Sequence, residues 1–342
     1  MKNKSKIVAA LLFAANLAFI SCDDWTDVES IDIKQPNIEE QNPELYTKYL
    51  ENLHQYKESN HKQIYAWFNN SEKSPFSLAH HLKSLPDSID AVSLNYPDNL
   101  SDWEIKEISD IQAKKGIKVI YDIDFDSIKI AYNRQQKVAV LETEPVAKEF
   151  EDFLMDSLQT ALKLSQKYKY DGVCIGYTGK ESTHMTETEK NEYIQNEILF
   201  MGIINDWQSR NSDKIMSFKG KTQNLYEKKF LKEYDIIFAL GTEATNKDML
   251  TYEYSLATGE GVPENCVGII VSTPSLDSSD KITGYLGSDL AIDKVAEWAA
   301  VPQGGQQVAG VGIYNVSNDY FYTDNDYKYT RKVIFTLNPS VK

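Results

Sequence analysis

The sequence predicts an α/β protein whose eight parallel strands close into a (β/α)8 TIM barrel. Short apolar runs rich in β-branched and aromatic residues recur along the chain, and segments with helical periodicity lie between them. The runs are continuously apolar, which is typical of strands buried on both faces. A doubly wound open sheet is the alternative, but no glycine-rich phosphate loop follows the first run, and 179–184 (GKESTH) lacks the spacing of such a loop.

Eight runs are expected to form the strands. They are 63–68 (QIYAWF), 89–96, 117–125, 172–177 (GVCIGY), 214–218, 234–240, 266–272 and 310–316. The expected helices are 101–115, 145–168, 186–208, 224–233, 246–257, 288–300 and 326–336. The segment 145–168 has the clearest pattern, because Pro145 can open a helix and Phe150, Leu154 and Leu158 follow at helical spacing.

The first 21 residues predict an export signal. Lysines precede an apolar run from Ile7 to Ile20 that is too short to cross a bilayer. The stretch resembles a bacterial lipoprotein signal, which implies cleavage before Cys22 and lipidation of its thiol; an ordinary cleaved signal with an incidental cysteine is the alternative. The next residues, DDWTDVE, resemble the surface-export tag of Bacteroides lipoproteins. This resemblance implies a lipid-anchored protein on the outer membrane that faces the exterior.

Composition indicates an acidic tether over 22–42 and one globular domain over 43–342. The formal charge of −15 argues against nucleic acid or anionic lipid as a partner and favours an uncharged ligand. Cys174 and Cys266 lie in apolar runs and are expected to be buried thiols. The five histidines lack the spacing of metal ligands, and the pair His80 and His81 is better explained as a solvated helix face. We therefore expect no metal and no cofactor.

In a barrel of this type the ligand lies at the carboxyl ends of the strands. These ends are rich in aromatic and amide side chains, which suit the faces and hydroxyl groups of sugars. The expected glycan-binding residues are Trp67, Asn95, Tyr96, Asp122, Tyr177, Thr178, Glu181, Lys219, Tyr314 and Asn315. Trp67 and Tyr177 are the expected ring anchors.

The fourth strand carries a more specific pattern. YDGVCIGYT, residues 170–178, resembles the strand of family 18 glycoside hydrolases, the chitinases and endo-β-N-acetylglucosaminidases, that ends in D-G-x-D-x-D-x-E. This resemblance places Asp171 on the first aspartate, and Cys174, Gly176 and Thr178 on the other three carboxylates. In that family the glutamate protonates the leaving oxygen and the neighbouring aspartate orients the substrate's acetamido group. The chain therefore lacks three carboxylates that the family's mechanism needs.

Two functions follow from this degenerate motif. The first is a non-catalytic glycan-binding lipoprotein that presents glycans, with a family bias toward N-acetylglucosamine-containing N-glycans, to a partner hydrolase and an outer-membrane importer. The second is an active endo-β-N-acetylglucosaminidase-like enzyme with a relocated general acid, for which Glu181, Asp122, Asp124 and Glu243 are candidates. We expect no catalytic residue of the family's usual type.

Overall fold

The computed structural model describes residues 38–142, 149–321 and 325–339. The chain separates into two compact units, residues 1–49 and 50–342. The described part of the first unit holds α2 (Ile38–Gln41) and the start of α3 (Pro43–Glu58), and the barrel lies within the second. The expected signal, the lipidation site Cys22, most of the tether and Pro145 lie outside the described residues.

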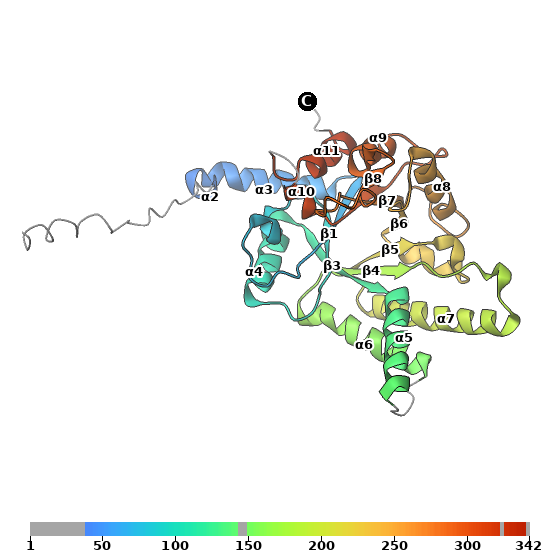
Figure 1. Ribbon diagram of the computed structural model, residues 1–342. Helices are drawn as coiled ribbons and strands as arrows, with labels where there is room; N and C mark the ends of the chain where they lie inside the picture. The colour runs from blue at the N-terminus through green and yellow to red at the C-terminus, as the bar shows by residue number, and fades with distance from the viewer. Residues whose placement is uncertain (1–37, 143–148, 322–324, 340–342) are drawn as a thin grey trace, which may run out of the picture. The chain divides into compact units, whose positions relative to one another are not determined.

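The second unit is a closed barrel of eight parallel strands, as the sequence predicts (Figure 1). The strands are β1 (Gln63–Phe68), β2 (Ala91–Leu94), β3 (Lys118–Asp124), β4 (Gly172–Tyr177), β5 (Ile215–Gly220), β6 (Ile236–Leu240), β7 (Val267–Ser272) and β10 (Gly310–Tyr314). Their order around the barrel is β1-β10-β7-β6-β5-β4-β3-β2, so sequence neighbours pair throughout. A short antiparallel pair, β8 (Tyr285–Leu286) and β9 (Asp289–Leu290), lies in the segment after β7.

Helices follow the strands and surround the barrel (Figure 1). They are α4 (Asp102–Asp110), α5 (Phe125–Glu142), α6 (Phe150–Lys167), α7 (Glu187–Arg210), α8 (Lys247–Ala257), α9 (Ala291–Ala299), α10 (Asn318–Phe321) and α11 (Lys328–Leu337). Two expectations need correction. The segment 224–233 contains 3-10 turns, at Thr222–Asn224 and Lys228–Glu233, in place of an α-helix. The sequence predicts no helix between the third strand and residue 145, because the segment after Asp124 has little apolar periodicity, but α5 lies there and begins at Phe125, where the third strand is expected to end.

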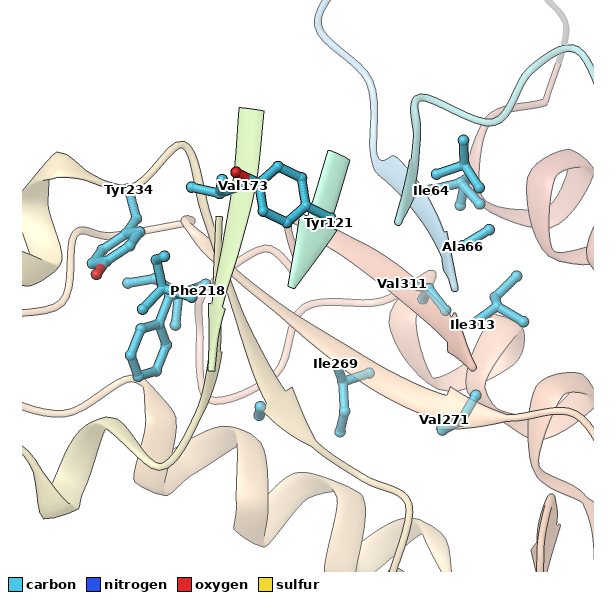
Figure 2. Packing of buried hydrophobic residues seen from close by; sticks show 14 of the residues in the cluster. Ile64, Ala66, Tyr121, Val173, Phe218, Tyr234, Ile269, Val271, Val311 and Ile313 are labelled. Atoms are coloured by element: carbon cyan, nitrogen blue, oxygen red, sulfur yellow. The ribbon is translucent and has the colours of Figure 1, made fainter. Parts of the chain in front are cut away.

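Alternating side chains of the strands fill two separate cores. One set fills the barrel interior and includes Tyr65, Trp67, Cys174 and Phe238. The other set packs between the barrel and its helices; Figure 2 shows ten of its labelled members, among them Tyr121, Val173 and Phe218. Because successive strand residues point to opposite faces, a position's parity decides which core it joins.

Three aspartates connect neighbouring strands at the amino-terminal end of the barrel. Asp90, Asp171 and Asp235 each stand one residue before an even-numbered strand, β2, β4 or β6. Each carboxylate accepts a hydrogen bond from a backbone N–H of the preceding strand, with donors at Ile64 (2.8 Å), Val119 (2.7 Å) and Met216 (2.7 Å) respectively. The retained first aspartate of the fourth-strand pattern, Asp171, therefore has a structural role of its own.

Candidate functional site

A hydrogen-bonded carboxylate lies at the centre of the barrel. Asp122 on β3 accepts hydrogen bonds from the indole Nε1 of Trp67 on β1 (2.9 Å) and from the hydroxyl of Ser93 on β2 (2.7 Å). The ammonium group of Lys219 on β5 donates to its other oxygen at 2.5 Å. Three strands thus supply donors to one carboxylate, and the resulting ion pair is internally neutral.

Two aromatic rings flank this ion pair. The Tyr314 ring on β10 meets Trp67 edge to face, with centroids 4.9 Å apart. The Lys219 ammonium lies 5.5 Å from the centroid of Tyr314 and 6.0 Å from that of Trp67, within the range of cation–π attraction. The lysine is therefore held by a carboxylate and by two rings. We call Asp122, Lys219, Trp67, Ser93 and Tyr314 the floor of the site.

Two proton donors of the floor, Lys219 and Tyr314, and the neighbouring Cys174 hold their protons firmly at neutral pH. Burial lowers the pKa of Lys219, but the charge and hydrogen bond of Asp122 together with nearby Tyr314 and Cys174 outweigh burial, and the net pKa is raised. Burial raises the pKa of Tyr314, and burial together with the charge of Asp122 raises the pKa of Cys174. A general acid needs a pKa close to the working pH. These three groups therefore do not exchange protons readily at pH 7.

A second carboxylate lies beside Gly176. An ideal Cβ added to Gly176 would lie 2.1 Å from Oδ2 of Asp124, so Asp124 occupies the space that a side chain at 176 would need. The other oxygen of Asp124 accepts a hydrogen bond from the backbone N–H of Ser127 (2.8 Å) in the first turn of α5. The β3 carboxylate is thereby fixed by the helix that follows it.

Three expected rim residues lie on the loops after their strands. Asn95 and Tyr96 are exposed, and the backbone of Tyr96 is fixed by both amide atoms of Asn70 (2.8 and 2.9 Å). Asn315 adopts a left-handed φ of 55°, and its side-chain amide donates to the hydroxyl of Ser272 (3.0 Å). The strand ends β2, β7 and β10 therefore present ordered polar groups around the floor.

The family described as "Glycoside hydrolase family 18, BT1044-like" matches residues 26–336. The chain belongs to glycoside hydrolase family 18. No curated protein matches it in sequence.

Solved structures of family 18 share the fold. A selenomethionine form of BT1044 with one substitution is 17% identical, with 88% of this chain and 95% of that chain covered and a TM-score of 0.58. An apo endo-β-N-acetylglucosaminidase from Cordyceps militaris is 14% identical, with coverage of 85% and 96% and a TM-score of 0.58. A chitinase from Bacteroides thetaiotaomicron is 13% identical, with coverage of 81% and 96% and a TM-score of 0.51. At these identities the likeness concerns the fold alone.

The residues predicted to replace the family 18 carboxylates occupy three different environments. Cys174 is buried in the barrel interior, paired in register with Asp122 of β3. Gly176 leaves its space to Asp124. Thr178 is half-buried, and its backbone N–H donates to Asp126 (2.9 Å) while its carbonyl accepts from Asn224 (2.8 Å).

The two expected ring anchors are not exposed. Tyr177 is 1% exposed and packs in the core between barrel and helices, where its hydroxyl donates to the buried carboxylate of Glu197 (3.1 Å). Alternate residues of a strand point to opposite faces, and Tyr177 points to the helix side. It therefore does not present its ring to the barrel mouth. Trp67 does face the interior, but it is 3% exposed and its indole is committed to Asp122. We therefore exclude Tyr177 from the candidate ligand contacts and assign Trp67 to the floor.

The two loop glutamates considered as relocated acids do not contact the floor. The exposed carboxylate of Glu181 accepts from the hydroxyl of Thr183 (2.6 Å). Glu181 lines a small cavity of about 130 Å³ whose described lining contains no floor residue. Glu243 is exposed on the loop after β6.

Three exposed rings lie on loops at the strand ends; Tyr96 is an expected ligand contact, whereas Phe76 and Phe321 are not predicted by the sequence. Phe76 follows β1 and is 79% exposed, Tyr96 follows β2 and is 51% exposed, and Phe321 ends α10 after β10 and is 47% exposed. These three strands are neighbours in the barrel. His80 connects two of the rings, with centroids 4.5 Å from Phe76 and 6.4 Å from Phe321. We call Phe76, Tyr96 and Phe321 the rim rings.

The described residues contain no cluster of three or more histidine, cysteine, aspartate or glutamate side chains that could hold a metal ion. Within the same part of the chain, every helix is too short or too polar to cross a membrane.

Proposed function

We propose that this family 18 protein is a non-catalytic glycan-binding lipoprotein of the cell surface. The observation that carries the proposal is the commitment of the barrel's central carboxylate, Asp122, to Lys219, Trp67 and Ser93. With three donors and a cation directed at it, this carboxylate serves as an acceptor inside the barrel, and its contacts do not present it as a proton donor to a leaving oxygen.

The chemistry of the predicted motif positions supports the same proposal. Cys174 keeps its proton because burial and Asp122 raise its pKa. Glycine at 176 offers no functional group, and a threonine hydroxyl at 178 is not an acid near neutral pH. Loss of general acid assistance alone commonly costs on the order of 10² to 10⁴ in rate. Turnover by the family's substrate-assisted route then falls toward background.

The binding surface of the proposal consists of the floor and the rim rings. The floor is neutral overall because Asp122 and Lys219 cancel, and this suits an uncharged ligand. The exposed rings Phe76, Tyr96 and Phe321 provide flat apolar faces on which sugar rings can stack. Asn95 adds an exposed amide beside Tyr96. We propose N-acetylglucosamine-containing glycans such as N-glycans as ligands, in keeping with the family.

The cellular setting is part of the proposal. Lipidation of Cys22 would anchor the chain to the outer membrane, and the acidic residues after it would direct the chain to the exterior. A surface glycan-binding protein needs partners to use its ligand, so we propose that a hydrolase and an outer-membrane importer receive the glycan.

A second function is favoured by one specific observation. The Asp124 carboxylate occupies the space beside Gly176 and so places an acidic group, from another strand, next to a predicted motif position. An endo-β-N-acetylglucosaminidase-like enzyme with Asp124 in the role of a relocated carboxylate is therefore the competing candidate. Oδ1 of Asp124 accepts the hydrogen bond from the backbone N–H of Ser127, whereas Oδ2 takes no part in this helix cap.

Glycan-array binding combined with product analysis on the same glycans separates the two candidates. The binding function predicts retention of specific N-glycans or chitin oligomers with no product above background. Product release that disappears in Asp124→Asn but persists in Glu181→Gln would establish the enzyme instead. The reverse pattern, with loss only in Glu181→Gln, would assign the acid to the loop after β4.

A further inference from the structure

A separate cavity lies outside the barrel interior, between the start of α5, the loop after β4 and one face of α7. Its volume is about 280 Å³, and its lining includes Phe125, Lys129, Gly179, Met185, Tyr193 and Asn196. Glu189, Tyr193 and Asn196 all contribute from α7, at helical spacings of four and three residues. The cavity is thus formed by regular elements and one short loop. We call it the side cavity.

The loop wall of the side cavity depends on a glycine. Gly179 has a φ of 58°, and an added Cβ would lie 2.2 Å from the hydroxyl oxygen of Tyr193. The same hydroxyl accepts a hydrogen bond from the backbone N–H of Lys180 (2.7 Å). The loop is therefore held tightly against α7, and the wall is preformed.

Most charged groups of the side cavity are already engaged, whereas the side chain of Lys180, which also lines it, is exposed. Glu189 accepts hydrogen bonds from the backbone and hydroxyl of Thr186 in the capping box that starts α7. Lys129 lies 4.0 Å from a carboxylate oxygen of Glu192, and its ammonium group lies 3.7 Å from the centroid of the Phe150 ring. A charged ligand would have to compete with these internal partners.

Asn196 supplies an uncharged polar group to this lining. The residue is 5% exposed, and its side-chain amide forms no hydrogen bond with a described residue. The amide atoms are not fully enclosed, so they are open to a molecule in the cavity. The amide offers two donors and one acceptor at a single position. Its complement is a neutral ligand with a donor and an acceptor side by side.

We infer that the side cavity binds one neutral sugar unit through the Asn196 amide. Its volume lies just below the range of about 300 to 1,000 Å³ that accommodates drug-sized ligands, which matches one ring better than an extended chain. Phe125 and Met185 offer apolar contact to the C–H face of the ring, and Asn196 pairs with a hydroxyl pair or an acetamido group. The inference relies on the proposed function only for the class of ligand, because the side cavity shares no residue with the floor or the rim rings.

Ligand-observed NMR titration of the full chain with N-acetylglucosamine and with mannose tests the inference, and glucuronate serves as a charged comparison. Asn196→Leu removes the amide at similar volume, and Asn191→Leu makes the same exchange at an exposed position of the same helix. We expect a neutral sugar to bind the wild type and Asn191→Leu alike. Asn196→Leu should bind about tenfold more weakly, the loss expected from one buried hydrogen bond. Asn196→Ser, which keeps a smaller polar group, should bind with intermediate affinity.

Several outcomes would overturn the inference. Absence of neutral-sugar binding to the wild type, binding by glucuronate alone, or unchanged binding in Asn196→Leu with its helix content intact would each do so. Failure of the proposed function is recognised separately. In that case oligosaccharides would not bind at the rim rings, whatever single sugars do at Asn196.

Discussion

Oδ2 of Asp124 lies 2.1 Å from the point where a Cβ on Gly176 would stand, so the β3 carboxylate and a side chain on β4 exclude each other. The exclusion explains why glycine suits position 176 in this chain. It also means that restoring an aspartate there would require Asp124 to move, although Asp124 is held at the start of α5 by its bond to Ser127.

The first prediction is that Gly176→Ala destabilises the protein by about 1 to 3 kcal/mol, because the new methyl group overpacks the site. Asp124→Ser shortens the side chain and keeps an oxygen that can cap α5. When Asp124→Ser is already present, Gly176→Ala should lower the free energy of unfolding by less than half as much as it does in the wild type. Chemical denaturation of both single variants and the double variant measures the coupling. Additive free energies would show that the two positions do not compete.

The second prediction contrasts two aromatic residues: Phe76, on the loop after β1, and Tyr177, at the end of β4. Phe76→Ala should weaken binding of the best array glycan about 5- to 150-fold, since the loss of one ring anchor costs about 1 to 3 kcal/mol. Tyr177→Phe should leave glycan affinity unchanged and lower stability by about 1 kcal/mol, because the buried Glu197 loses one donor. Calorimetric titration and thermal unfolding measure the two effects. Reduced affinity in Tyr177→Phe with unchanged affinity in Phe76→Ala would return the site to the original expectation.

The architecture was predictable because each strand is a compact apolar run bounded by turn residues. All eight strands lie where the sequence places them, and the (β/α)8 fold follows from their alternation with helices. The helix α5 was missed because its sequence has weak amphipathicity and begins at Phe125, an aromatic residue that continues the apolar pattern of β3. Tertiary packing of Phe125 against Phe150 and Phe200 decides the boundary there.

The site was predicted less well, for two physical reasons. The carboxyl end of a strand exposes alternate side chains to the mouth and to the helices, and Tyr177 was selected without assigning its parity. The expected network residues Trp67, Asp122, Lys219 and Tyr314 do come together, but their mutual hydrogen bonds and ring contacts depend on register between strands that sequence alone does not supply. Phe76 and Phe321 lie in loops whose path has no periodic signal.

The third prediction concerns His61, whose Nε2 lies 2.9 Å from Oδ1 of Asp90. Burial lowers the pKa of His61, but the hydrogen bond and charge of Asp90 outweigh it and the net pKa is raised above the usual value. A raised pKa stabilises the fold fully below the unfolded value of about 6.5, and this contribution is lost as the pH rises through the folded pKa. The difference in unfolding free energy between wild type and His61→Gln should therefore be larger at pH 6 than at pH 8. An equal difference at both pH values would exclude a charged His61.

The fourth prediction tests the lipid anchor. Cys22→Ala should abolish incorporation of labelled fatty acid and release the protein from the outer-membrane fraction, because the resemblance makes the Cys22 thiol the acceptor of diacylglycerol. Cys266→Ala is the matched control, since Cys266 is a partly buried thiol of the barrel, and it should keep label and location. Label retained in Cys22→Ala would indicate an ordinary signal and another mode of attachment.

The last prediction follows from the Asn196 amide that lines the side cavity. Leucine favours helices more than asparagine does, and Asn191→Leu on the exposed face of α7 reports this gain alone. Denaturant unfolding in sugar-free buffer first gives the free energy of unfolding of wild type and of both variants. Addition of the neutral sugar should then stabilise wild type and Asn191→Leu but not Asn196→Leu, because only a folded site with its amide gains from binding. A loss of stability in Asn196→Leu would instead mean that the amide serves the fold, and the side cavity would no longer be explained by a ligand.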